Sequence, residues 1–272
     1  MDPALAELAR RNSFRGVIAA DEVQHLGLAL PDLLPLAARY ARPPVSGFSV
    51  GAVAQGLSGA VYLGANIEFP GQPLNASVHA EQSAVANAWM HGERGLSLLA
   101  VTAAPCGHCR QFLHELAHPP TLLLPGREPS PLSTFLPDAF GPHDLGIAGG
   151  LMDPADHRLT IDSDDPLLRA ALEAANASHA PYTRAYAGAA LRTADGAVVT
   201  GRYAENAAFN PGLPPLQCAV ALLVLSGRSL DEVTAAALVE HPAPASHAEP
   251  ARALLAPLGI PVTVALARPL QS

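Results

Sequence analysis

Two cysteines and a histidine carry the clearest chemistry in this sequence of 272 residues. The stretch "PCGHCRQF" places Cys106 and Cys109 three positions apart, where the pattern predicts that a helix begins. Residues at positions i and i+3 share one face of a helix, so both sulfurs can reach one metal ion. The pair alone is also typical of thiol–disulfide exchange, or of a structural zinc site that has two further ligands.

His79, in "VHAEQ", is the favoured third ligand because it also stands where a helix is predicted to begin. Two other histidines lie closer to the cysteines along the chain, His108 and His114. His108 falls between the cysteines and is predicted to point elsewhere on the helix, as an ordinary surface or hydrogen-bonding residue. Cys218 lies in an apolar helical run, which favours a buried small hydrophobic residue over a ligand.

Glu81 follows His79 by two positions, and Pro105 directly precedes the cysteines. His-x-Glu followed by Pro-Cys-x-x-Cys is the signature of zinc deaminases that act on nucleobases. One imidazole and two thiolates fill three tetrahedral positions on zinc and leave the fourth for water, whose pKa falls to near neutrality. Glu81, beside the metal but not bound to it, would pass protons to the ring nitrogen N3 and to the departing amino group. The cysteines are therefore predicted to form the edge of a catalytic site.

The periodicity of apolar residues predicts the elements that position these side chains. A helix at "PDLLPLAARYA" precedes two period-two segments, "FSVGAVAQ" and "AVYLGANIEF", which a Gly-Ser turn joins into a hairpin. The segment "SVHAEQSAVANAWMHGE" is predicted to be a helix that ends at Gly92. A strand in "LSLLAVTAA", a helix in "CGHCRQFLHELA" and a strand in "TLLLPG" follow. This ββαβαβ order predicts an α/β unit, with helices against a mixed sheet.

The opening pattern returns in the second half of the chain, where residues 180–209 resemble residues 43–69. By letter, Gly51 matches Gly188, and the string from Asn66 to Phe69 matches the string from Asn206 to Phe209 after a three-residue insertion. The second copy has neither His-x-Glu nor Cys-x-x-Cys. We therefore predict that one copy carries the chemistry and that the other is scaffold.

Domain boundaries follow from the repeat and from a Pro-, Gly- and Asp-rich stretch at about 126–160. The predicted division is an N-terminal helical segment at 1–24, a catalytic domain at 25–143, a linker at 144–160 and a degenerate domain without a metal site at 161–272.

Composition excludes several classes of function. The net charge is −8 and all 16 basic residues are arginines, without the basic stripe that nucleic-acid binding requires. No run of 18 apolar residues predicts a membrane span, and the N-terminus lacks the apolar core of a signal peptide, so a cytoplasmic location is expected. Three cysteines do not make a disulfide framework in a chain of this length.

The sequence resembles the cytidine deaminases of the large, two-domain, homodimeric bacterial and plant type. The resemblance rests on "GANIEF", "VHAEQSAVANAW", "PCGHCRQF", "LPDAFGP" and "SHAPY", and extends over nearly the whole chain. It implies a three-layer α/β/α fold, duplicated as a catalytic and a degenerate domain. It also implies one zinc ion per subunit, at His79, Cys106 and Cys109, with Glu81 as proton shuttle. The implied reaction is hydrolytic deamination of cytidine and 2′-deoxycytidine, with release of ammonia, in pyrimidine salvage.

The resemblance further implies which residues contact the substrate. Asn66 and Glu68 would bind the ribose 3′-hydroxyl and Phe48 would pack on the base. The further substrate residues implied in the same subunit are Ile67 and Ala80, and those implied from a partner subunit are Phe140, Ala208 and Phe209. On the residues alone, a phenylalanine in an alternating strand is more often core, and Asn-x-Glu at a strand end is more often turn chemistry. Two residues apart on a strand, however, Asn66 and Glu68 point to the same side.

Two other functions compete with this interpretation. A polynucleotide-editing deaminase would use the same zinc chemistry, but it needs a basic groove and exposed aromatic residues to hold a single strand. A net charge of −8 and 5% aromatic residues argue against it. A zinc-stabilised binding module without activity would have four protein ligands on the metal and would leave Glu81 without a role.

Overall fold

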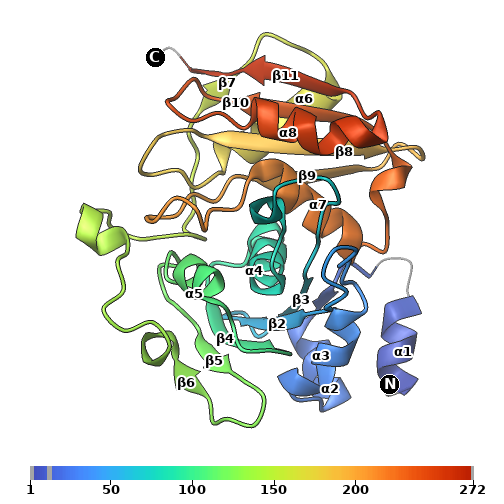
Figure 1. Cartoon of the computed structure of the whole chain (residues 1–272), viewed down its shortest axis with the longest axis vertical. Helices are drawn as coiled ribbons and strands as arrows, with labels where there is room; N and C mark the ends of the chain where they lie inside the picture. The colour runs from blue at the N-terminus through green and yellow to red at the C-terminus, as the bar shows by residue number, and fades with distance from the viewer. Residues whose placement is uncertain (1–2, 11–13, 271–272) are drawn as a thin grey trace. The chain divides into compact units, whose positions relative to one another are not determined.

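The computed structural model describes residues 3–10 and 14–270, and the chain divides into two compact units (Figure 1). Unit 1 comprises Met1–Asp153 with Val224–Gly227, and unit 2 comprises Pro154–Leu223 with Arg228–Ser272. The finer boundaries predicted at 24, 143 and 160 stay predictions. Parts of the predicted N-terminal helical segment, residues 1–2 and 11–13, lie outside the described residues.

Unit 1 contains the predicted ββαβαβ order. Its helices and strands are α1 (Pro3–Arg10), β1 (Val17–Ile18), α2 (Ala20–Leu26), α3 (Leu30–Ala38), β2 (Gly51–Gly56), β3 (Val61–Ala65), α4 (Ala80–Met90), β4 (Leu96–Val101), α5 (Gly107–Leu113), β5 (Thr121–Leu123) and β6 (Ser130–Pro131). The strands form one mixed sheet in the order β1-β3-β2-β4-β5-β6, in which β4 and β5 are parallel and the other neighbours are antiparallel.

Two glycines let helices approach this sheet closely from opposite faces. A β-carbon on Gly64 in β3 would lie 2.2 Å from the backbone nitrogen of Ala84 in α4. A β-carbon on Gly51 in β2 would lie 2.5 Å from the backbone nitrogen of Ala38, at the end of α3. Because Gly64 pairs with Ala52, the residue after Gly51, the two glycines face opposite sides of the sheet. The sheet therefore lies between α3 and α4, which confirms the three-layer α/β/α prediction.

The core on the α3 side of the sheet is made of aliphatic residues. Leu33 and Leu36 of α3 belong to one buried cluster with Val53 of β2 and Leu63 of β3, each at most 1% exposed. Burial of such a side chain contributes roughly 1.5–3 kcal/mol. This packing makes the sheet a rigid support for the loops at its edge.

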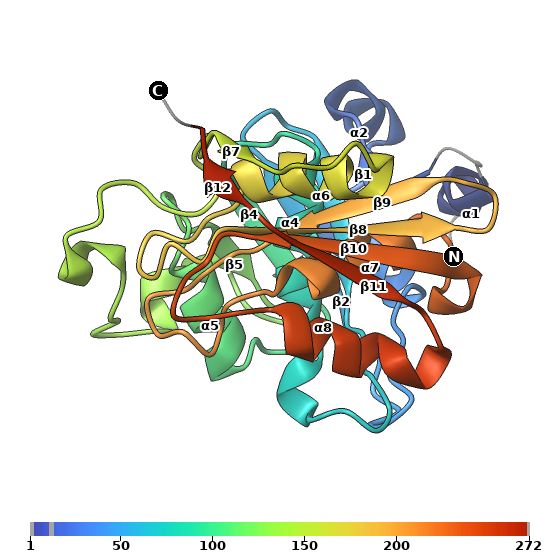
Figure 2. The ribbon, with the colours of Figure 1, turned by 90° about the horizontal axis from the view of Figure 1, so that it is seen from above.

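Unit 2 repeats the arrangement with fewer strands. Its helices and strands are β7 (Leu159–Thr160), α6 (Pro166–Asn176), β8 (Ala187–Thr193), β9 (Val198–Arg202), α7 (Pro215–Leu225), β10 (Val233–Glu240), α8 (Ala248–Leu255), β11 (Val262–Leu266) and β12 (Arg268–Pro269). A four-stranded sheet has the order β11-β10-β8-β9, and β12 pairs with β7. Figure 2 shows this sheet edge-on, with α6 on one side and α8 on the other.

The repeat is real, but its predicted alignment is wrong beyond the first strands. In unit 1 the backbone of Arg42 pairs with the backbone of Asn66 and Glu68: Arg42 N donates to Asn66 O, and Glu68 N donates to Arg42 O. In unit 2 the corresponding bonds join His179 to Tyr203 and Glu205: His179 N donates to Tyr203 O, and Glu205 N donates to His179 O. No insertion separates the copies here, so Asn66 corresponds to Tyr203 and not to Asn206. The strings "NIEF" and "NAAF" are alike by letter, whereas the backbone ladder sets the register.

Within the described ranges, no helix is long and apolar enough to cross a membrane.

Candidate active site

The three predicted metal ligands meet in unit 1. His79 directly precedes α4 and Cys106 directly precedes α5, both with extended backbone, and Cys109 lies one turn into α5. His79 Nδ1 lies 3.5 Å from Cys106 Sγ and 3.3 Å from Cys109 Sγ, and the two sulfurs are 3.7 Å apart. Zinc bonded tetrahedrally to two thiolates and an imidazole requires about 3.8 Å between the sulfurs and about 3.6 Å between sulfur and nitrogen. The donor set therefore fits zinc in both chemistry and spacing.

The starts of α4 and α5 converge on this group. The partial positive charge at a helix N-terminus favours negative charge, and so favours the ionised form of the thiols. The backbone N–H of His79 donates to Gln82 Oε1 at 3.1 Å, which fixes the turn into α4. The backbone N–H of Arg110 donates to Cys106 O at 3.1 Å, which closes the first turn of α5.

The two thiols share a hydrogen bond that separates their titration. The bond from Cys109, with a second contact to His79, lowers the pKa of Cys106 to about 3. The same bond to Cys106, together with burial, raises the pKa of the Cys109 thiol. The contact with Cys106 raises the pKa of His79. A metal ion binds thiolates, so a divalent cation would displace any proton that the pair retains.

Glu81 lies in the first turn of α4 and is only 4% exposed. Burial raises the pKa of its carboxyl, although a contact with the Cys109 thiol acts in the opposite direction. A buried carboxyl group with a raised pKa, beside the ligands but outside the ligand set, retains a proton more readily than a free carboxyl group, as a group that both accepts and releases protons must. This is the environment that the predicted proton shuttle requires.

His108, which was predicted to be an ordinary surface or hydrogen-bonding residue, packs against the predicted ligand His79. Its imidazole is half-buried and stacks on that of His79, with ring centroids 4.9 Å apart and planes 24° apart. Burial lowers the pKa of His108. The stacking restrains the His79 ring, and no signal in the sequence pointed to it because it joins two different helix starts.

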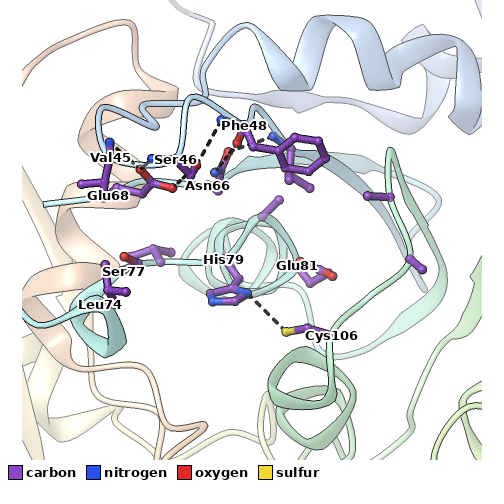
Figure 3. Close-up of a pocket in the computed structure, with 15 residues that line it drawn as sticks. Val45, Ser46, Phe48, Asn66, Glu68, Leu74, Ser77, His79, Glu81 and Cys106 are labelled. Atoms are coloured by element: carbon purple, nitrogen blue, oxygen red, sulfur yellow. Dashed lines mark hydrogen bonds between the residues drawn. The ribbon is translucent and has the colours of Figure 1, made fainter.

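A cavity of about 470 Å³ opens in front of the ligands (Figure 3). His79, Glu81 and Cys106 lie along one wall, and Phe48, Asn66 and Glu68 lie along the opposite wall. The full set of lining residues is Val45, Ser46, Phe48, Val50, Asn66, Glu68, Leu74, Ser77, Val78, His79, Ala80, Glu81, Ala103, Ala104 and Cys106. The structure therefore brings most of the residues predicted for the catalytic subunit to one cavity.

Ile67 is the exception among the substrate-binding residues predicted from the same subunit. Its side chain is 3% exposed, and the residue forms backbone bridges to Arg42 and Val78 instead of lining the cavity. It lies between Asn66 and Glu68, whose side chains alternate with its own. Burial of Ile67 therefore turns both polar neighbours towards the cavity.

Asn66 and Glu68 hold the loop that carries Phe48. Glu68 Oε2 accepts from the backbone N–H groups of Val45 and Ser46 at 2.8 and 2.9 Å, and Glu68 Oε1 accepts from the Ser46 hydroxyl at 2.5 Å. Burial acts in the opposite direction, but these bonds prevail and lower the pKa of Glu68. Asn66 Nδ2 donates to Phe48 O, and Asn66 Oδ1 accepts from Val50 N, both at 2.9 Å. The amide and the carboxylate thus build the wall of the cavity.

Phe48 is exposed, which rules out the core position that alternation in a strand would favour. It precedes β2, and 60% of its side chain is accessible. Ser46 was missed by the sequence interpretation. Its Oγ accepts from Phe48 N at 3.0 Å while donating to Glu68, so it links the aromatic ring to the carboxylate. A serine two residues before the loop's aromatic residue, in "VSGF", is the turn signal that could have identified it.

The residues predicted to act from a partner subunit are surface residues. Phe140 is 47% exposed and Phe209 is 61% exposed, and Ala208 is exposed as well. Phe209 has a φ of 59°, in the left-handed region that bulky residues rarely adopt. None of the three lines the cavity described above. A side chain held outwards by a strained backbone is available for contact with another molecule.

Known proteins resemble this chain over most of its length. A family model of the cytidine and deoxycytidylate deaminase zinc-binding region matches residues 28–123, and a second model with the same description matches residues 132–252. A cytidine deaminase of Pectobacterium atrosepticum is 49% identical over 271 residues, 95% of this chain and 91% of that protein. One from Vibrio cholerae is 48% identical over 248 residues, 88% of this chain and 84% of that protein. A crystal structure of the cytidine deaminase of Mycobacterium tuberculosis is 34% identical, with a TM-score of 0.38, and covers 41% of this chain and 94% of that one.

Proposed function

The chain belongs to the cytidine deaminase family, and we propose that it catalyses zinc-dependent hydrolytic deamination of cytidine and 2′-deoxycytidine. The products are uridine or 2′-deoxyuridine and ammonia, and the role is pyrimidine salvage. The observation that carries the proposal is the ligand group His79, Cys106 and Cys109, at tetrahedral spacing, with Glu81 on the same cavity wall. We assign the metal to these three residues and the proton shuttle to Glu81.

Zinc supplies an acidified water molecule when it is bound by three protein ligands. The chain itself moves the protons. Glu81 would accept a proton from water and deliver it to N3 of the cytosine ring. It would then accept a second proton, from the hydroxyl group that has added at C4, and deliver it to the amino group as that group leaves. The balance is water plus cytidine on one side, and uridine plus ammonia on the other. Burial of Glu81 supports this role, because it keeps bulk water from competing for the proton.

We assign substrate positioning to the opposite wall of the cavity. The exposed ring of Phe48 would pack on the base, and Asn66 with Glu68 would bind the ribose 3′-hydroxyl. Each carboxylate oxygen can accept two hydrogen bonds, and Glu68 Oε1 is used once, by Ser46. One acceptor position therefore remains for the hydroxyl. Ala80 would contribute through its place in the cavity wall, and Ile67 by orienting its two neighbours.

Charge favours free nucleosides over phosphorylated substrates. Among the described residues that line the cavity, none is Arg or Lys, whereas Glu68 and Glu81 are acidic. A phosphate on the 3′-oxygen would remove the hydrogen-bond donor and bring two negative groups together in a partly enclosed site. Internal cytosines of a polynucleotide carry such a phosphate, so a polynucleotide substrate is not favoured.

A homodimer with composite active sites is the proposed assembly. Phe140, Ala208 and Phe209 are exposed and would close the pocket of the partner subunit, which accounts for the strained backbone at Phe209. We further propose a cytoplasmic location. The domain organisation proposed is a catalytic domain at 25–143, between the segments 1–24 and 144–160, and a degenerate domain at 161–272.

Glu81→Gln tests the reaction itself. The variant is expected to keep its zinc and to lose about 10²–10⁴-fold in kcat, because the amide accepts no proton. Turnover is followed by the loss of cytidine absorbance, and zinc content is measured on the same samples. Glu173→Gln, at an exposed position on α6, is the control and should match the wild type. A Glu81→Gln enzyme with more than about a tenth of the wild-type rate would contradict the shuttle assignment.

Mixed dimers test the composite site. Glu81→Gln and Phe209→Ala chains, each with its own tag, are co-expressed and the heterodimer is isolated. If the sites are composite, one of its two sites is intact: Glu81 comes from the Phe209→Ala chain, and Phe209 comes from the Glu81→Gln chain. We expect this heterodimer to regain about half of the wild-type rate, although each parent homodimer is impaired. If Phe209 acts within its own subunit, the heterodimer will show no such complementation. The molar mass from light scattering establishes the number of subunits independently.

A further inference from the structure

Helix α5 carries, besides Cys109, two side chains that bind a segment far along the chain. Arg110 Nε donates to Pro105 O, and Arg110 Nη1 donates to Phe135 O, both at 2.8 Å. Gln111 Nε2 donates to Phe140 O at 2.7 Å. Arg110 thus links the turn before Cys106 to Phe135, 25 positions further along the chain, and Gln111 links α5 to Phe140, 29 positions further along.

The same segment also packs against the end of α5. A β-carbon on Gly141 would lie 2.6 Å from His114 Nε2, so the chain at Gly141 rests directly on that imidazole. Gln111 and His114 are at i and i+3, and Arg110 and His114 are at i and i+4, so all three side chains lie on one side of the helix. Residues 135–141 are therefore attached to α5 at three points.

We infer that Arg110 and Gln111 are positioning residues of the deaminase, which set the metal-binding turn and the segment bearing Phe140 from one helix. The inference rests on the proposed function for the role of Phe140. Arg110 acts on the turn that presents Cys106, and Gln111 acts on the backbone from which Phe140 projects. Neither residue lines the cavity, so both act through other groups.

The guanidinium of Arg110 holds the turn that presents Cys106 better than another cation would. Its donors are fixed in one plane, so Nε and Nη1 reach two carbonyls at once with little loss of side-chain entropy. Pro105 is buried, and its carbonyl would lose its partner in the absence of Arg110. A lysine ammonium is a compact charge on a flexible stem and cannot reproduce the fork. The position of Cys106 is then less restrained.

Gln111 holds the segment through its bond to the backbone carbonyl of Phe140. Phe140 is 47% exposed, so neighbouring residues leave about half of its surface uncovered. The bond to its carbonyl fixes the backbone on which the ring is mounted. Loss of this bond should loosen residues 135–141 and leave the ligands of the metal undisturbed.

Arg110→Lys and Gln111→Ala test the inference on the full chain loaded with zinc. Arg110→Lys is expected to release zinc to a chelator about tenfold faster than the wild type, as is typical when support of a metal ligand is lost. Gln111→Ala should release zinc at the wild-type rate. Chymotrypsin should cleave this variant severalfold faster than the wild type between residues 135 and 141. Its KM for cytidine should rise severalfold with kcat little changed. Arg252→Lys, on the exposed side of α8, is the control and should match the wild type throughout.

The readouts separate this inference from the proposed function. Zinc release and proteolysis need no activity, so a chain that deaminates no cytidine can still be tested. Unchanged zinc release in Arg110→Lys would overturn the role of Arg110, and unchanged cleavage in Gln111→Ala would overturn the role of Gln111. If Arg110→Lys fails to fold, Gln111→Ala still decides whether α5 holds the segment.

Discussion

Glu68 in unit 1 and Glu205 in unit 2 make the same three bonds in two copies of one fold. Among the described residues, however, the one His and Cys group that could hold a metal ion lies in unit 1. Glu205 Oε2 accepts from the backbone of Tyr182 and Thr183 at 2.8 and 3.2 Å, and Glu205 Oε1 accepts from the Thr183 hydroxyl at 2.6 Å. This pattern repeats that of Glu68 with Val45 and Ser46. A carboxylate is therefore required at this place by the turn itself, and any contact with a substrate is added to that structural task.

The difference between the units lies in what surrounds this shared turn. The position of Asn66 is taken by Tyr203, which is 9% exposed. The position before the helix, where unit 1 has Cys106, is taken by His247. The rings of Tyr203 and His247 lie 4.2 Å apart, and Glu240 accepts from Ser246 Oγ and His247 N to hold the turn. At the positions where unit 1 has the polar residues Asn66 and Cys106, unit 2 thus has two packed rings.

The two units also differ in the polar contacts that hold their hairpin turns. In unit 1 the turn between β2 and β3 is held by Ser58 Oγ, which donates to the buried carboxylate of Glu93 at 2.5 Å. In unit 2 the turn between β8 and β9 is held by Asp195, whose carboxylate pairs with Arg228 at 2.6 Å on the surface. One scaffold therefore tolerates either a buried or an exposed polar contact at this turn, because the backbone turn is common to both.

The largest effect should come from the ligands, since they are what the units do not share. Cys106→Ala or Cys109→Ala is expected to abolish both zinc binding and detectable deamination, because three ligands are needed to hold a catalytic zinc ion. Cys218→Ala, which removes the buried cysteine of unit 2, should leave the zinc content and kcat unchanged and cost about 1 kcal/mol of stability. Zinc content and rate are measured on the same preparations. Loss of zinc in Cys218→Ala would break the assignment.

Glu68→Gln and Glu205→Gln form a matched pair that separates the structural task from substrate binding. Each variant points an amide NH₂ at backbone donors, so each should lose about 1–3 kcal/mol of stability. The loss should be larger for Glu205, which is fully buried. Only Glu68→Gln should lower kcat/KM for cytidine, by about tenfold or more, through loss of a charge-assisted bond. Equal kcat/KM values for the two variants would mean that Glu68 holds the loop and nothing else.

The rings of unit 2 should make stability depend on pH. Burial lowers the pKa of His247 to about 4, and its buried Nε2 has no hydrogen-bond partner among the residues that the structure describes. Between the unfolded pKa of about 6.5 and about 4, the unfolded chain binds a proton that the native chain does not, so the free energy of unfolding falls as pH falls through this window. The loss should reach up to about 3 kcal/mol.

His247→Phe should reduce this acid sensitivity while keeping a ring against Tyr203. Denaturant unfolding at pH 7.5 and pH 5 measures the effect in both proteins. Acid also protonates the zinc ligands, but it does so equally in the wild type and the variant, so the difference between them reports on His247. Parallel stability curves for the two proteins would exclude His247 as the source.

The smallest effects are expected at the hairpin turns. Glu93→Gln should destabilise unit 1 by about 1–2 kcal/mol, since a buried hydroxyl then loses its charged acceptor. Arg228→Gln removes exposed ion pairs with Asp195 and Glu232 and a 3.2 Å hydrogen bond to Thr193 Oγ1, so its effect on the melting temperature should be smaller and should largely vanish in high salt. Melting curves at low and high ionic strength compare the two. An effect of Arg228→Gln that persists undiminished in high salt would show that these ion pairs are not surface contacts.

Short-range patterns in the sequence determined much of this protein. Cys106 and Cys109 share a helix face because of their spacing, and His79 with Glu81 stands at a helix start because of the apolar period that follows. The alternation in "FSVGAVAQ" and "AVYLGANIEF" predicted β2 and β3, and the ββαβαβ order predicted the layered fold. These features depend on contacts within one turn or one hairpin, which a local pattern encodes.

Only the tertiary structure decided which distant residues meet. The bond between Ser46 and Glu68 spans 22 positions, that between Gln111 and Phe140 spans 29, and the stacking of His108 on His79 joins two helices. The equivalence of Glu68 with Glu205 likewise follows from the backbone ladder, while matching letters pointed to Asn206. Such pairs are set by how the helices pack on the sheet, at sites such as Gly64, where a single β-carbon would collide with α4. No local pattern records the outcome of that packing.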